Sequence, residues 1–175
     1  EVSASTHAGR GHNIMMSETN VYIAETNWNY MSSSIPGVLP SGGVWTAMLK
    51  FAMNGGSPQF SKLITIPGSV LNQFSMDEHR DHLRVATTYG EMWSNPPTSV
   101  SGVYIFNANG EQTGEVTELA PGERIYSARF EGDKAYVVTF RQVDPLFVLD
   151  LRDPTAPIVQ GQLKIPGFSN YLHPV

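Results

Sequence analysis

The feature that most constrains the fold is an internal repeat with an offset of 52 residues. Residues 126–140 repeat the pattern of residues 74–88, and each copy is a short apolar run, a polar tip and an alternating run. That order is typical of a β-hairpin, and repetition within one chain indicates a repeat architecture. The matching positions are Phe74 with Tyr126, Ser75 with Ser127, Asp81 with Asp133, Leu83 with Ala135, Val85 with Val137, and Thr87 with Thr139.

Each hairpin is followed by two further predicted strands. The segments "GVYIFNANGEQTGEV" and "LFVLDLRDPTAPIVQGQLKI" each contain a strand, a turn and a second strand. Their turns are rich in Asn, Gly, Asp and Pro, which favour chain reversal. An earlier copy fits strands at 20–27, 45–53 and 61–66. A Pro-Gly pair closes each unit, at Pro67-Gly68, Pro121-Gly122 and Pro166-Gly167.

Units of four short antiparallel strands at this spacing predict an all-β fold of the β-propeller type. We place one domain over residues 1–175, with blades at about 12–66, 72–120 and 124–165 and the first strand of a fourth blade at 168–175. A β-sandwich also consists of evenly spaced short strands. It has no need of a repeat at a blade's length, so the repeat favours the propeller.

Three blades are too few to close a ring, because closed propellers have about four to eight. We therefore expect a partial propeller. The chain is then part of a longer protein, or shares one ring with a second copy, or forms an open arc whose exposed faces associate. We favour a fragment that pairs with another copy of itself.

Composition excludes several partners. The chain has 11 Lys and Arg against 16 Asp and Glu, and neither sign forms a run of five, so nucleic acid is not an expected partner. No apolar stretch approaches the ~18 residues of a transmembrane segment. Without cysteine there is no disulfide or thiolate site. His79 and His82 have no third ligand nearby in sequence, so we expect no metal and no cofactor.

Two long stretches carry a family resemblance. "LNQFSMDEHRDHLRVATTYGE" (71–91) and the segment from 121 to 175, with "YVVTFRQVDPLFVLDL", closely resemble secreted bacterial and archaeal proteins that contain a C-terminal β-propeller domain. The resemblance covers most of 45–175, and residues 1–44 match only loosely. It implies a secreted or cell-surface location and a parent protein longer than this chain. It brings no catalytic residues.

One face of the predicted propeller carries the longer loops, and we call it the loop face. It holds the connections between second and third strands and those between successive blades. Exposed aromatic residues there could stack on sugar rings or anchor a peptide, so a protein or carbohydrate ligand is expected. The alternative is that they cover the core. The loop-face binding candidates are Trp28, Tyr30, Trp93, Arg141 and Asp144.

The inner strands place a second group near the predicted central channel. The repeat register brings Asp77, Glu78, Arg129 and His173 towards the channel mouth, where they could bind an ion or perform acid-base chemistry. The alternative is a structural ion pair between neighbouring blades, joining Arg129 to Asp77 or Glu78.

We expect an exported propeller fragment that acts as a binding or interaction module rather than an enzyme. The alternative is a propeller enzyme whose channel-mouth active site is completed by blades outside this chain. A third hypothesis is a structural spacer, which predicts that the loops of Trp28 and Trp93 pack flat without an exposed aromatic patch.

Overall fold

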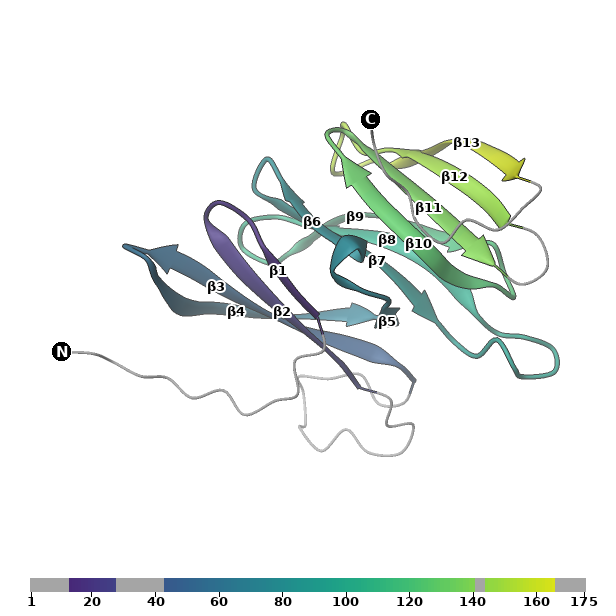
Figure 1. The fold of residues 1–175 in the computed structure, drawn as a ribbon, viewed down its shortest axis with the longest axis horizontal. Coiled ribbons are helices and arrows are strands. Elements are labelled where there is room, and N and C mark those ends of the chain that lie inside the picture. Colours follow the sequence, from purple (N-terminus) through teal and green to yellow (C-terminus); the bar gives the residue numbers. More distant parts are fainter. Residues whose placement is uncertain (1–12, 28–42, 141–143, 166–175) are drawn as a thin grey trace.

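The first sheet contains a strand along which side-chain burial alternates with a period of two. In a computed structural model that describes residues 13–27, 43–140 and 144–165, buried and half-buried residues alternate along 20–27. Residues that alternate in this way point to opposite faces of a sheet. The strands pair antiparallel in chain order (Figure 1). They are β1 (Asn13–Met16), β2 (Asn20–Asn27), β3 (Trp45–Asn54) and β4 (Ser57–Pro67).

The second sheet has an inner strand in two pieces. A 3-10 turn, η1 (Gln73–Ser75), separates β5 (Ser69–Val70) from β6 (Met76–His79), and both strands pair with β7. The side chain of Asn72 caps η1 by accepting a hydrogen bond of 3.0 Å from the backbone N–H of Phe74. The remaining strands are β7 (His82–Tyr89), β8 (Val100–Phe106) and β9 (Gln112–Leu119).

The third sheet has the same strand order as the first. Its strands are β10 (Arg124–Glu131), β11 (Lys134–Phe140), β12 (Asp144–Asp150) and β13 (Ile158–Ile165). The inner hairpins of the second and third sheets share one register, because Met76 lies opposite Val85 and Ala128 lies opposite Val137.

Two hydrophobic cores fill the spaces between the sheets. The first contains Tyr22 and Met48 from the first sheet and Val85 and Phe106 from the second. The second joins Ile105 of β8 to residues of the third sheet such as Val137 and Leu149. Because side chains alternate along β8, Tyr104 and Phe106 enter the first core, whereas Val103 and Ile105 enter the second. Strands β7 and β8 of the second sheet are therefore buried on both faces.

Buried threonines hold the segments around the Pro-Gly pairs. Thr87 Oγ1 donates a hydrogen bond of 2.7 Å to the carbonyl oxygen of Pro67. Thr46 Oγ1 donates one of 2.8 Å to the carbonyl oxygen of Gly68. Thr139 Oγ1 donates one of 2.5 Å to Oε2 of Glu123. The threonines lie near one end of their strands, so these bonds fix the connections at that end.

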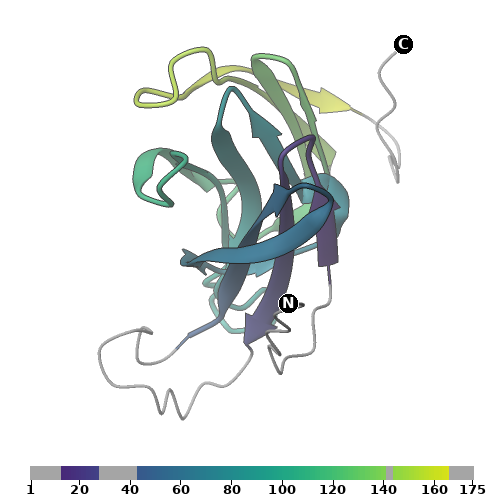
Figure 2. The ribbon, with the colours of Figure 1, turned by 90° about the vertical axis from the view of Figure 1, so that its left-hand side faces the viewer.

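The inner strands of the three sheets come together. Both β1 and β10 contact η1, so the first and third sheets meet the inner edge of the second. Figure 2, seen from the side of the first sheet, shows that sheet in front of the other two. Three antiparallel sheets in succession with converging inner strands confirm the predicted all-β partial propeller. The predicted strand at 168–175 lies outside the described residues. Within the described part, no helix has the length and apolar character of a membrane span.

Candidate functional site

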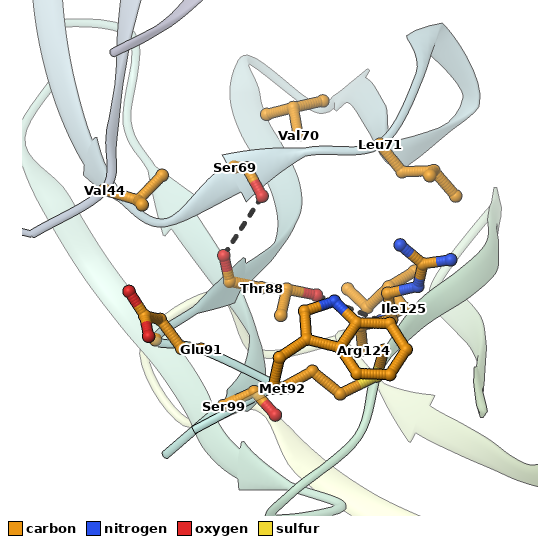
Figure 3. Close-up of a pocket in the computed structure, with 12 residues that line it drawn as sticks. Val44, Ser69, Val70, Leu71, Thr88, Glu91, Met92, Ser99, Arg124 and Ile125 are labelled. Carbon is orange, nitrogen blue, oxygen red and sulfur yellow. Dashed lines mark hydrogen bonds between the residues drawn. The ribbon is translucent and has the colours of Figure 1, made fainter. Parts of the chain in front are cut away.

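A cavity of about 540 Å³ opens on the loop face, at the ends of strands from all three sheets (Figure 3). The second sheet contributes both its inner strand and the loop from 90 to 99, which joins β7 to β8. The first sheet contributes the residue that precedes β3, and the third sheet contributes the start of β10. The residues that define its walls are Val44, Ser69, Leu71, Glu91, Trp93 and Arg124.

Trp93 is the most exposed of the large apolar side chains in the described residues, at 87%. The loop that carries Trp93 is held by hydrogen bonds between its own residues. The carbonyl oxygen of Glu91 accepts hydrogen bonds from the backbone N–H groups of Thr98 (2.9 Å) and Ser99 (3.2 Å). The hydroxyl of Ser94 donates to the carbonyl oxygen of Pro96 at 2.9 Å. The indole is therefore presented to solvent by an ordered loop.

A glycine allows this loop to close. Gly90 has a φ of +84°, in the left-handed region that glycine tolerates best. A Cβ atom at this position would lie 2.3 Å from the carbonyl oxygen of Thr98, closer than atoms approach in proteins. The start and end of the loop can therefore meet only because residue 90 has no side chain.

Two side chains of opposite charge line the cavity. Glu91 and Arg124 lie on opposite sides of the view in Figure 3. Both residues are exposed. Among the described residues, neither side chain has a hydrogen-bond or ion-pair partner. The cavity therefore presents a carboxylate acceptor and a guanidinium donor that are both available to a ligand.

The floor of the cavity combines apolar and hydroxyl groups. Val70 and Ile125 are buried and supply the apolar part. The hydroxyl of Ser69 donates to the carbonyl oxygen of Thr88 at 3.2 Å, the bond drawn in Figure 3. The Thr88 hydroxyl accepts from the backbone N–H of Ile125 at 3.0 Å. The buried hydroxyl of Ser99 has no partner within the described part of the chain.

The channel-mouth candidates Asp77 and Glu78 take different partners. Asp77 forms an ion pair with Arg84, which is opposite it in the same hairpin. Its partner is thus Arg84 where the sequence suggested Arg129. Glu78 turns towards the first sheet, where its Oε1 accepts hydrogen bonds from Asn20 Nδ2 (2.7 Å) and Tyr22 Oη (3.0 Å). Burial raises the pKa of Tyr22, and the charge and hydrogen bond of Glu78 raise it further.

Asp77 and Arg129 nevertheless line one cavity between the inner strands. Its volume is about 340 Å³, and its apolar walls include Met16 and Phe74. The guanidinium of Arg129 lies over the ring of Phe74, 4.5 Å from its centroid. The two charged groups therefore share this cavity, but the Asp77 carboxylate is already engaged by Arg84.

Most of the other candidates named from the sequence fall outside the part of the chain that the structure describes. Trp28, Tyr30, Arg141 and His173 lie outside the described residues. Asp144 is the first residue of β12, at the end where that strand follows the second-to-third connection. Its side chain is not described.

The two histidines of "HRDH" take separate partners. Nε2 of His79 lies 3.2 Å from Oδ1 of Asp133 in the third sheet. The ring of His82 instead contacts the carbonyl oxygen of Arg80 at 2.8 Å. In the described ranges, no three His, Asp or Glu side chains gather in a way that could hold a metal ion.

Sequence reasoning missed Glu91 and Arg124. A signal for both was present, because Arg124 follows the Pro121-Gly122 pair closely and Glu91 follows the end of a predicted strand. Both connections were assigned to the loop face, but the candidates chosen there were Trp28, Tyr30, Trp93, Arg141 and Asp144.

Sheets whose inner strands converge, with a cavity where their loops meet, define a partial β-propeller. The chain belongs to the β-propeller domain family, whose family model matches residues 1–175.

The chain is also similar in sequence to two archaeal proteins. An uncharacterized protein of Methanocaldococcus jannaschii is 49% identical over 110 residues, which are 63% of this chain and 18% of that protein. An uncharacterized protein of Archaeoglobus fulgidus is 47% identical over 109 residues, or 62% of this chain and 16% of the relative. The matched segment thus spans less than a fifth of the length of either relative. No solved structure matches the chain.

Proposed function

We propose that this propeller segment is a binding module and that the loop-face cavity is its ligand site. The observation that carries the proposal is the exposure of Trp93, at 87%, on a braced loop beside Glu91 and Arg124. Single exposed apolar residues are common on protein surfaces, whereas an exposed apolar patch that is rimmed by polar groups marks a site of interaction. Rigid aromatic side chains and arginines contribute much of the affinity of binding sites.

The surroundings of Trp93 support the same proposal. Tyr89, at the end of β7, is 42% exposed, and Leu71 in the cavity wall is 46% exposed. A cavity of about 540 Å³ falls within the range of about 300–1,000 Å³ that is typical of small-ligand sites. The spacer hypothesis required Trp93 to pack flat, so its exposure favours binding.

A binding role is better supported than the enzyme alternative. A general acid or base needs a titratable group that is free to exchange a proton with a substrate. The Asp77 carboxylate is held by Arg84, and Glu78 is directed towards Asn20 and Tyr22. The channel mouth therefore offers less to a substrate than the loop-face cavity does.

The test is a paired selection on the immobilised chain and its Trp93→Ala variant, with a glycan array and a random peptide library as probes. We expect ligands that bind the parent chain and lose most of their affinity on the variant. If every ligand recovered bound both proteins equally, or if neither probe set yielded a ligand, the cavity would not be the site. Trp93 is exposed, so the variant should melt within a few degrees of the parent.

We also propose that the segment pairs with a second copy. The outer strands at both ends carry exposed apolar side chains, with Phe60 and Leu63 on β4 and Ile158 and Leu163 on β13. Exposed apolar strands at sheet edges tend to associate. Light scattering after size exclusion should give the mass of a dimer, and a single monomer peak would contradict pairing.

The secreted or cell-surface location remains a proposal that rests on the family resemblance. Fractionation of cells that naturally produce the protein would test it. We expect the protein in the surface or extracellular fraction, and recovery only from the cytosol would contradict this location.

A further inference from the structure

We propose that the ligand of the loop-face cavity is a neutral saccharide, with one sugar ring stacked on Trp93 and its hydroxyl groups between Glu91 and Arg124. This inference rests on the proposed binding function and names the ligand class of the same site.

The exposure of the Trp93 indole favours a sugar as the ligand. Trp93 stands open to solvent at 87% exposure, so it offers a flat, unfilled platform. An aromatic face is weakly negative, and it attracts groups with a positive edge. The C–H bonds on one face of a pyranose ring form such a surface, which is also flat and apolar. Stacking covers the indole without a deep pocket.

The charged pair favours a neutral ligand that both donates and accepts hydrogen bonds. The Glu91 carboxylate is an acceptor, and the Arg124 guanidinium has five donors in a planar fork. Neither has a partner among the described residues. The two side chains carry opposite charges, so together they add no net charge to the cavity. Sugar hydroxyls donate to one and accept from the other.

The hydroxyl groups in the cavity fit the same ligand class. Ser69 uses its hydrogen to donate to the carbonyl oxygen of Thr88, which leaves its oxygen able to accept. Ser69 is half-buried and lines the cavity, and Figure 3 shows its hydroxyl turned towards Thr88. Its oxygen adds an acceptor to the cavity that Glu91 and Arg124 also line.

Strand geometry disfavours an extended peptide. A peptide that adds to a sheet gains its affinity from backbone hydrogen bonds along an open edge. Two edge strands reach this cavity: β5, which is only two residues long, and the start of β10, where the backbone N–H of Ile125 already donates to the Thr88 hydroxyl. The cavity therefore offers few such bonds, whereas a saccharide requires none of them.

The experiment uses the 175-residue chain with arrayed neutral glycans, uronic-acid glycans and a random peptide library, followed by affinity measurements on variants. We expect selective binding of neutral glycans. Affinity should fall at least tenfold in Trp93→Ala, less in Trp93→Phe because a flat ring remains, and severalfold in Glu91→Gln and Arg124→Met. The matched control is Phe74→Ala, which removes an exposed aromatic residue that lines the other cavity and should leave affinity unchanged.

Each other result overturns a distinct part of the proposal. Binding only of uronic-acid glycans, lost in Arg124→Met and kept in Glu91→Gln, would overturn the neutral class. Trp93-dependent binding of peptides without glycans would overturn the saccharide and leave the binding function standing. If no glycan and no peptide depended on Trp93, the binding function itself would fail. Thermal melts of all variants serve as the control that each variant is folded.

Discussion

Arg84 in β7 donates a hydrogen bond of 2.6 Å to the carbonyl oxygen of Gly132, in the turn between β10 and β11 of the next sheet. The same guanidinium pairs with Asp77 and lies 5.3 Å from the centroid of the Phe130 ring. Its side chain is only 3% exposed. One buried cation therefore ties the second sheet to the third.

Replacing Arg84 with Met should destabilise the fold by about 2–4 kcal/mol, because it leaves Asp77 and the Gly132 carbonyl without their partner. Urea unfolding measures this change. The matched control is Arg80→Met, which removes an ion pair to Asp133 from a side chain that is 68% exposed. We expect the control to cost less than about 1 kcal/mol. Equal losses in the two variants would contradict the role of Arg84.

Tyr22 should make stability depend on alkaline pH. Its pKa is raised in the folded state by burial and by Glu78. An unfolded Tyr ionises near pH ~10, so the stabilisation is complete below that pH and is lost as pH rises above it. Tyr22→Phe should cost about 1–2 kcal/mol at neutral pH.

The difference between parent and Tyr22→Phe should then shrink above pH ~10, because the variant cannot ionise at this position. Urea unfolding at neutral and at alkaline pH gives both values. Tyr89→Phe, at an exposed position, serves as the control and should show little change at either pH. A constant difference for Tyr22→Phe would argue against this linkage.

The hydroxyl of Thr87 should contribute more than its methyl group. Thr87→Val keeps the shape but removes the hydrogen bond to the Pro67 carbonyl oxygen, which we expect to cost about 1–3 kcal/mol. Thr87→Ser keeps the bond and should lose less. Thermal unfolding of both variants checks the order, and a Val variant as stable as the Ser variant would show that the bond is dispensable.

Alanine substitutions at Gly90 and Gly56 should distinguish the effect of a steric clash from that of backbone strain. Both have a φ of +84°, but a Cβ at Gly56 would meet nothing within 4 Å. Gly56→Ala should therefore cost about 1 kcal/mol, the price of the left-handed conformation alone. Gly90→Ala should cost clearly more and shift the fluorescence of the chain, because Trp93 lies three residues away. Equal stability losses would mean that the loop adjusts easily around the new methyl group.

The sequence predicted the fold class because strand periodicity and the blade-length pattern act over many residues at once. The predicted strand at 20–27 is β2, and the hairpin pattern at 126–140 covers β10 and β11. The interruption of the inner strand by η1 was missed, because it depends on the local cap at Asn72. Such caps compete with strand pairing over only a few residues.

The sequence alone named one residue of the candidate site. Trp93 stood out as a tryptophan in a long loop, but exposed charges such as Arg124 resemble any solvated side chain until a cavity is seen beside them. The partner of Asp77 was within reach of the sequence. A turn at residues 80 and 81 sets Asp77 opposite Arg84, and cross-strand neighbours interact. The predicted partner was Arg129 in the neighbouring blade, whereas the partner in the structure is Arg84 in the same hairpin.

The burial of β7 and β8 on both faces has a consequence for local unfolding. Opening of the third sheet would expose one core and leave the other intact, and the same holds for the first sheet. Opening of β7 and β8 would expose both cores together. The amide hydrogens of these two strands should therefore exchange with solvent most slowly, close to the rate of global unfolding, while β4 and β13 exchange through smaller openings.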